Sequence, residues 1–159
     1  MNKTLEAAWE RCKGCRLCEL VCSLSHEGSC NPELSRVRVL RLSHHLAAFP
    51  SICLMCTNPA CRQACPTGAV ELDDATGSVR VNAARCIGCR ECVGACPFGA
   101  IFISPESGRA IKCDLCDGEP RCVQVCPCGA LLYEEPSRLN VEKRRAYAKI
   151  VTEREVNQE

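Results

Sequence analysis

Most of the 18 cysteines in this chain of 159 residues fall into four runs of four. The third run, C-I-G-C-R-E-C-V-G-A-C-P, places two residues between Cys86, Cys89 and Cys92, and three more before Cys96 and Pro97. Thiolates at this spacing are typical of [4Fe–4S] binding. One tight loop offers three thiolates to one cluster, while the fourth cysteine points toward a second cluster. Such runs therefore work in pairs.

Three other runs repeat this arrangement, two of them with a wider middle gap. The second and third cysteines are separated by four residues in the second run and by five in the fourth. Gly14 and Gly88 take the same position in the first and third runs, where the absence of a Cβ lets the backbone approach the inorganic sulfides. The first run has Ser23 where the others have proline. These runs comprise Cys12, Cys15, Cys18 and Cys22; Cys53, Cys56, Cys61 and Cys65; and Cys113, Cys116, Cys122 and Cys126.

Two cysteines are expected to be non-ligands. The later runs continue as C-P-T-G-A-V, C-P-F-G-A-I and C-P-C-G-A-L, which places Cys128 where Thr67 and Phe98 stand. We therefore expect Cys128 to be a small buried side chain. Cys30 belongs to no run. The sixteen others of the 18 cysteines suffice for four clusters with four ligands each.

Disulfide scaffolds and zinc proteins are the alternatives for a cysteine-rich chain. The N-terminus has neither an apolar run nor a twin arginine, and no stretch approaches the ~20 apolar residues of a membrane span, so we expect a cytoplasmic protein. A reducing cytosol disfavours disulfides. Zinc sites usually draw four ligands from C-x2-C pairs, which these runs fit poorly. A zinc-stapled structural or nucleic-acid module is thus a minor alternative.

Composition and motifs narrow the function. A net charge of +1 gives no argument for nucleic acid or an anionic membrane. Aromatic residues make up 4% of the chain, too few for a conventional core, so we expect metal binding and folding to be coupled. There is no P-loop, no G-x-G-x-x-G motif and no clustering of Ser, His and Asp. One-electron transfer is the chemistry that remains.

Short elements are expected between the runs. Alternating residues predict a strand near 36–42, and turn residues predict hairpins over 69–81 and 100–112, followed by a strand over 130–134. Residues 23–34 read as a loop. Helical spacing also predicts a short amphipathic helix over 1–11. Its Trp9 either covers the cluster core or docks on a partner. The same spacing predicts a final helix over 141–155 with an apolar face. That face comprises Tyr147, Ile150 and Val151.

The four runs resemble those of the four-cluster iron–sulfur subunits of multi-subunit oxidoreductases. That family includes electron-transfer subunits of molybdenum and tungsten enzymes, of formate hydrogenlyase-type hydrogenases and of carbon monoxide dehydrogenase. The resemblance covers about residues 10–135. The stretches C-R-L-C-E-L-V-C-S-L-S-H-E-G and N-P-E-L-S-R-V-R-V are most similar to the small iron–sulfur subunits of tungsten aldehyde oxidoreductases.

The resemblance implies an α+β fold of tandem bacterial two-[4Fe–4S] ferredoxin-like units, one inserted in the other, with short hairpins and a C-terminal helix. The outer unit is expected at 1–45 and 110–138, the inner unit at 46–109, and a docking helix at 139–159. Four ligand sets follow: Cys12, Cys15, Cys18 and Cys126; Cys22, Cys113, Cys116 and Cys122; Cys53, Cys56, Cys61 and Cys96; and Cys65, Cys86, Cys89 and Cys92.

The function implied is that of an electron-transfer subunit carrying four [4Fe–4S] clusters, not an enzyme on its own. It would relay single electrons between a catalytic subunit, such as a tungsten or molybdenum pterin aldehyde oxidoreductase, and a second electron donor or acceptor protein. A free soluble polyferredoxin is the alternative, as is the same role in a hydrogenase, formate dehydrogenase or CO dehydrogenase. No nucleic acid and no direct membrane insertion are expected.

Polar residues near the runs lead to two further expectations. His26, His44 and His45 are expected in loops or interfaces rather than as ligands, because the cysteines suffice. Cations beside a cluster favour its reduced form and carboxylates disfavour it. We therefore predict a higher potential for the cluster of the first run than for that of the fourth. The residues concerned are Arg11, Lys13 and Arg16 in the first run, and Asp114, Asp117 and Glu119, against Lys112 and Arg121, in the fourth.

Overall fold

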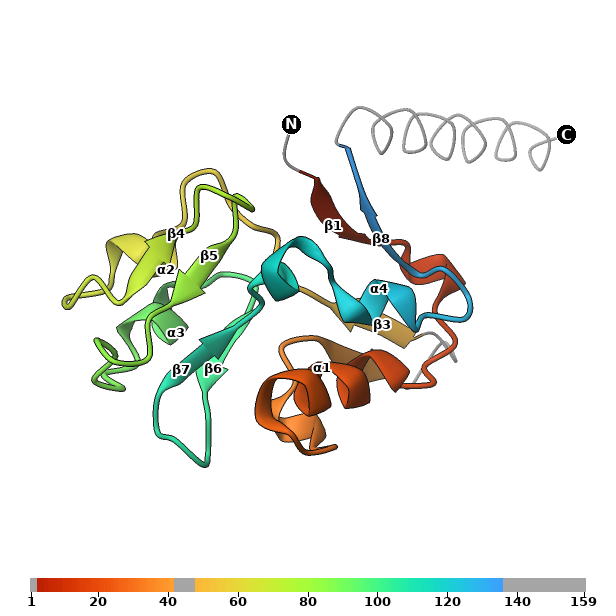
Figure 1. Ribbon diagram of the computed structural model, residues 1–159, viewed down its shortest axis with the longest axis horizontal. Coiled ribbons are helices and arrows are strands. Elements are labelled where there is room, and N and C mark those ends of the chain that lie inside the picture. Colours follow the sequence, from red (N-terminus) through yellow and green to blue (C-terminus); the bar gives the residue numbers. More distant parts are fainter. Residues whose placement is uncertain (1–2, 42–47, 136–159) are drawn as a thin grey trace, which may run out of the picture.

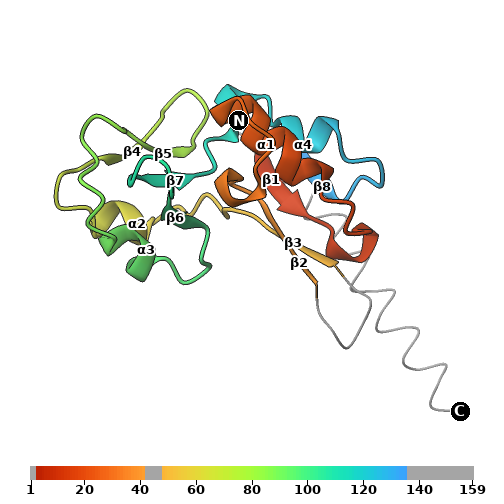
Figure 2. The same cartoon turned by 90° about the horizontal axis from the view of Figure 1, so that it is seen from below.

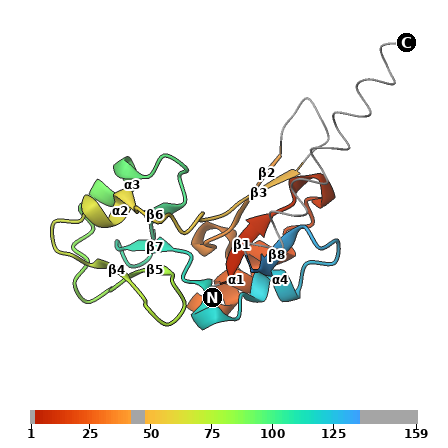
Figure 3. The ribbon, with the colours of Figure 1, turned by 90° about the horizontal axis from the view of Figure 1, so that it is seen from above.

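The computed structural model describes residues 3–41 and 48–135. Short helices and two-stranded antiparallel sheets form two lobes (Figure 1). Within the described residues, the first lobe comprises those before about residue 53 and after about residue 112, and the second lobe comprises those in between. The same two lobes lie side by side when seen from below and from above (Figures 2 and 3). The predicted final helix, His44 and His45 lie outside the described residues.

The predicted helix over 1–11 is wrong. Residues Thr4–Ala7 form strand β1, which pairs antiparallel with β8 (Leu131–Glu134), and Trp9–Arg11 form the 3-10 turn η1. Leu5 lies opposite Tyr133 and is 4% exposed. The pairing partner lies more than 120 residues away in sequence. Local periodicity cannot report such a contact, and tertiary pairing decides the conformation.

Ser23 explains why the first run carries a longer helix. Helix α1 (Leu17–Glu27) continues beyond Cys22, whereas each later helix ends before the run's proline. Ser23 retains the backbone N–H that proline lacks. Its buried Oγ donates to the Glu19 carbonyl at 3.1 Å and accepts from the Asn31 amide at 3.1 Å. Residues 23–27 are therefore helical, not part of a loop as predicted. The later helices are α2 (Ala60–Gln63), α3 (Glu91–Ala95) and α4 (Arg121–Gln124).

The predicted strands between the runs are confirmed. β2 (Arg38–Arg41) pairs with β3 (Ala48–Ser51) beyond the turn η2 (Pro32–Leu34). The two predicted hairpins also form, and each delivers the chain to the next cysteine run. They are β4 (Val70–Leu72) with β5 (Val79–Val81), and β6 (Ile101–Ile103) with β7 (Ala110–Lys112).

Each lobe has its own apolar core, and cysteines form part of both cores. Within each, small aliphatic side chains from the strands pack against cysteines of the short helices, in keeping with the scarcity of aromatic residues. The first core contains Leu5, Cys18, Cys22, Val37, Val39, Ala48, Ile52, Leu115, Cys122 and Leu131. The second contains Cys61, Val70, Val79, Cys92, Ile101 and Ala110. The architecture is a small α+β, ferredoxin-type fold.

Polar contacts join the two lobes. The Arg38 guanidinium stacks over the Phe102 ring, 4.4 Å from its centroid. Arg80 of β5 pairs with Asp117, which lies in the turn η3 (Leu115–Gly118), at 2.5 Å. Asp117 is largely exposed, so water screens this pair and it contributes little to stability.

Candidate functional site

Four cavities are each lined by four of the sixteen run cysteines. Three of the cysteines come from one run and the fourth comes from another run. The four groups are Cys12, Cys15, Cys18 and Cys126; Cys22, Cys113, Cys116 and Cys122; Cys53, Cys56, Cys61 and Cys96; and Cys65, Cys86, Cys89 and Cys92. The chain thus joins the first run with the fourth and the second with the third.

The thiols gathered in each cavity need a nearby positive charge if they are to be held together as thiolates. Burial, the neighbouring Glu19 and two other thiols of its cavity together raise the pKa of Cys18 to about 12. Burial and the neighbouring Cys86, Cys65 and Cys89 raise the pKa of Cys92 to about 11. Four thiolates cannot be held together in such a site without positive charge. Iron in a cysteine-ligated [4Fe–4S] cluster supplies that charge, so the donor sets fit this cofactor.

The loop between the first two cysteines adopts the same backbone conformation in all four runs. The second residue after the first cysteine has a positive φ each time: 69° at Gly14, 45° at Met55, 69° at Gly88 and 61° at Leu115. Only glycine takes this conformation without cost. The sequence indicated it for the two glycines and missed Met55 and Leu115. Leu115 is 1% exposed, and its packing in the first core compensates for the strain.

Backbone amides point at several sulfur atoms. Arg36 N–H donates to Cys22 Sγ at 3.3 Å, Ala110 N–H to Cys86 Sγ at 3.4 Å, and Ala130 N–H to Cys126 Sγ at 3.2 Å. Burial raises the pKa of Cys126, but hydrogen bonds from the amides of Leu131, Ala130 and Cys128 and from the Cys128 side chain outweigh it, so the net pKa is lowered. These amides therefore stabilise sulfur in its anionic, ligating form.

Cys128 lies closer to a cavity than its predicted role suggests. It is half-buried rather than buried, it lines the cavity of the first run, and its Sγ is 3.8 Å from Cys126 Sγ. Cys30 is exposed and lines none of the four cavities. That both are non-ligands stays a prediction. Trp9 is 48% exposed and likewise lines none of these cavities.

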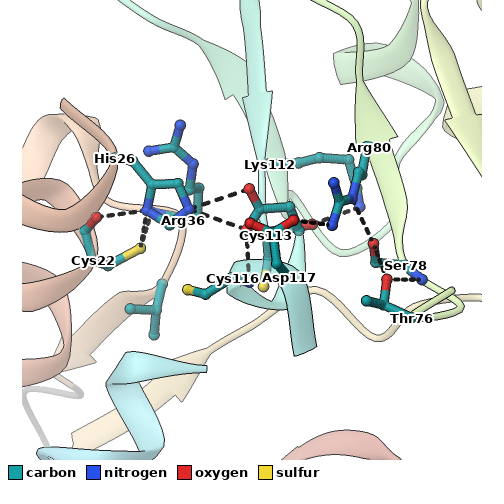
Figure 4. Close-up of polar contacts among 12 residues, drawn as sticks. Cys22, His26, Arg36, Thr76, Ser78, Arg80, Lys112, Cys113, Cys116 and Asp117 are labelled. Atoms are coloured by element: carbon teal, nitrogen blue, oxygen red, sulfur yellow. Dashed lines mark hydrogen bonds and ion pairs between the residues drawn. The ribbon is translucent and has the colours of Figure 1, made fainter. Parts of the chain in front are cut away.

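His26 links the first and fourth runs. Its Nδ1 donates to the Cys22 carbonyl at 2.8 Å (Figure 4). Its Nε2 lies 3.0 Å from Asp114 Oδ1. The bond to Asp114 is the largest of several that raise the pKa of His26 to about 12. Burial opposes ionisation of Asp114, but the bond to His26 outweighs it and holds the pKa of Asp114 well below its usual range. An imidazolium–carboxylate pair results.

This pair corrects two expectations. His26 lies on helix α1 and lines a cysteine cavity, rather than lying in a loop. The comparison of cluster potentials set Asp114 and two other carboxylates against Lys112 and Arg121 alone, whereas His26 also balances Asp114. Asp117 is likewise paired with Arg80. The charge difference between the first and fourth runs is therefore smaller than their sequences suggest, and the predicted order of potentials is untested.

The comparisons with known proteins agree with this site. The model of the 4Fe-4S dicluster domain matches residues 44–135, and that of a 4Fe-4S binding domain matches residues 9–25. The polyferredoxin-like subunit of the aliphatic sulfonate oxidoreductase of Pyrococcus furiosus is 46% identical over 112 residues, covering 70% of this chain and 64% of that subunit. The electron transport protein HydN of Escherichia coli is 36% identical over 139 residues, covering 74% of this chain and 77% of HydN.

A third relative is, like the first, a subunit of an oxidoreductase. The thiosulfate reductase electron transfer subunit PhsB of Salmonella typhi is 39% identical over 116 residues, covering 67% of this chain and 58% of PhsB. Within the described residues, no helix has the length and apolar character needed to cross a bilayer. The matched domains and the cysteine content show that [4Fe–4S] clusters are the cofactor. The chain belongs to the 4Fe-4S dicluster ferredoxin family, within its group of polyferredoxin-like electron-transfer subunits of oxidoreductases.

Proposed function

We propose that this chain is a cytoplasmic electron-transfer subunit that binds four [4Fe–4S] clusters. It relays single electrons between a catalytic oxidoreductase subunit and a second redox protein. The observation that carries the proposal is the presence of four cavities, each lined by four cysteines drawn from two runs. The catalytic partner we propose is a tungsten or molybdenum pterin enzyme, such as an aldehyde oxidoreductase.

The ligands we propose are the sixteen run cysteines, grouped as they line the cavities. Positive φ at the second residue after the first cysteine of each run supports this assignment, because it turns the loop around a common centre. The amides directed at Cys22, Cys86 and Cys126 also support it, since hydrogen bonds to ligating sulfur stabilise the more negative, reduced cluster. Cys30 and Cys128 are proposed to be non-ligands.

The two cores support a tandem arrangement, with an inner two-cluster unit inserted into an outer one. Ala48 and Ile52 pack in the first core, while β7 pairs with β6 and Ala110 packs in the second. We therefore place the inner unit at about residues 53–112. This range is a few residues later at each end than the sequence suggested. The outer unit comprises the described residues on either side.

The cluster number is tested first. Protein purified without oxygen should contain about 16 irons per chain and no stoichiometric zinc, because four cubanes hold four irons each. Cys92→Ser should lose or convert one cluster, whereas Cys30→Ser, at an exposed cysteine outside the cavities, is the matched control and should retain the full iron content. Iron near eight, with zinc present, would contradict the proposal.

The partner is tested by co-purification. A tagged chain expressed in its own host should be recovered with a pterin-containing catalytic subunit, and native mass should report a hetero-oligomer. Recovery of a monomer that holds about 16 irons would favour a free polyferredoxin. Recovery with a hydrogenase, formate dehydrogenase or CO dehydrogenase subunit would keep the electron-transfer role and replace the proposed partner.

A further inference from the structure

Lys112 is a buried lysine at the end of β7, directly before Cys113. Its side chain is 5% exposed, which is unusual for this residue type. Three acceptors surround its Nζ: the Val79 carbonyl, the Cys113 carbonyl at 3.0 Å and Met55 Sδ at 4.0 Å. A neutral amine has only two hydrogens to donate, so three acceptors match the ammonium form. Figure 4 shows Lys112 beside Cys113.

No carboxylate neutralises this ammonium within the described part of the chain. Each ion pair found there involves Arg16, Arg36, Arg80, Arg85 or His26, not Lys112. Buried charges are normally paired or coordinate an ion, because burial of an unpaired charge is costly. The surroundings of Lys112 must therefore supply negative charge from another source.

The position of Lys112 identifies that source. Lys112 itself lines the cavity of Cys53, Cys56, Cys61 and Cys96 in the second core. Its neighbour Cys113 lines the cavity of Cys22, Cys116 and Cys122 beside the first core. The ammonium thus stands at the junction of the two lobes, where a ligand cavity of one lobe adjoins a ligand cavity of the other.

We propose that Lys112 is the shared counter-charge of the two clusters on either side of this junction and raises both of their reduction potentials. The inference deepens the proposed function and rests on it. Reduction adds one electron to a cluster that four thiolates already make anionic, and no bond forms or breaks. A fixed cation nearby favours that more negative state. Exposed Lys13 and Arg16 are screened by water, whereas Lys112 is not.

A shared counter-charge also bears on electron relay between the lobes. Lys112 stabilises an added electron on both sides of the junction, so it raises both potentials while changing their difference little. The driving force for transfer across the junction is then nearly unchanged. The two clusters farther from Lys112, in the cavities of Cys12 and of Cys86, are expected to feel the charge much less.

The test is Lys112→Met, which removes the charge and keeps most of the side-chain volume. Redox titration of the purified complex, followed by electron paramagnetic resonance, measures the four midpoint potentials. Cys61→Ser and Cys122→Ser variants assign the two junction signals. We expect at least a tenfold fall in the reduction equilibrium at both junction clusters, which is about 59 mV for a one-electron couple. The other two potentials should stay within a twofold change of that equilibrium.

Two matched variants complete the design. Arg62→Met removes an exposed cation next to Cys61 that lines none of the four cavities, and it should change every potential less than twofold in equilibrium. Lys112→Arg keeps the charge and should keep both junction potentials. If Lys112→Met fails to retain iron, the Arg variant decides: retained potentials support the role, and a fall in both overturns it.

Other outcomes separate this inference from the function on which it rests. Unchanged potentials in Lys112→Met with full iron content, or equal shifts at all four clusters, would overturn the role of Lys112 alone. About eight irons in the wild-type chain, where four clusters require about 16, would overturn the proposed function instead.

Discussion

Gly88 is the residue whose replacement most directly tests the loop geometry. It lies between Cys86 and Cys89 with φ of +69°, and a Cβ added there would overlap the carbonyl oxygen of Gly108 in the β6–β7 turn. Backbone atoms of a hairpin cannot move aside as a flexible side chain can. We therefore predict that Gly88→Ala displaces either the ligand loop or the hairpin.

The magnitude follows from two contributions. Alanine at positive φ costs about 1–2 kcal/mol, partly offset by about 0.4–1 kcal/mol from the restricted unfolded chain. Overlap with a fixed carbonyl adds about 1–3 kcal/mol, as in other overpacked sites. Gly99→Ala is the matched control, because Gly99 also has a positive φ, +60°, but a Cβ there meets nothing within 4 Å. It should show only the first contribution.

Urea unfolding without oxygen, followed by the visible absorption of the clusters, measures both variants. With a urea dependence of about 1–3 kcal/mol per molar, the midpoint of Gly88→Ala should fall roughly 1 M below that of Gly99→Ala. Gly14→Ala should lie between them, since the nearest atom to its Cβ would be the Ala48 methyl carbon, at 3.1 Å, and the next would belong to the flexible Arg41 side chain. Equal midpoints for Gly88→Ala and Gly99→Ala would refute the proposed contact with Gly108.

Three further predictions follow from the cluster framework. Cys128→Ser should retain all four clusters by iron analysis, whereas Cys126→Ser should lose or convert one; equal loss would make Cys128 a ligand. His26→Ala, by leaving Asp114 unpaired, should lower both stability at pH 6 and the potential of the adjacent cluster. Because the pKa of His26 is raised, its stabilisation is full below about pH 6.5 and declines as pH rises toward 12; a pH-independent effect would contradict this reasoning. Removing residues 139–159 should leave iron content intact but abolish association with the catalytic subunit in co-purification; retained association would exclude a docking role.

Local signals in the sequence were sufficient for the repeated parts of the fold. The two hairpins are confirmed because their turn residues and alternating strands act over a dozen residues. The C-P-x-G-A repeats are confirmed in the same way, since Gly68, Gly99 and Gly129 all have a positive φ near 60°. Cysteine spacing likewise indicated [4Fe–4S] binding, because three ligands of each cluster come from one short loop.

The remaining features depend on contacts between distant segments, and only the tertiary structure decides them. Residues 4–7 form a strand because β8 lies beside them. Asp114 does not act on the cluster as an unpaired carboxylate, because the helix that continues through Ser23 places His26 beside it. From the sequence alone, Lys112 is predicted to be an ordinary solvated charge. It becomes a buried cation only when the two lobes close around it, since burial is a property of the assembled fold and not of any local pattern.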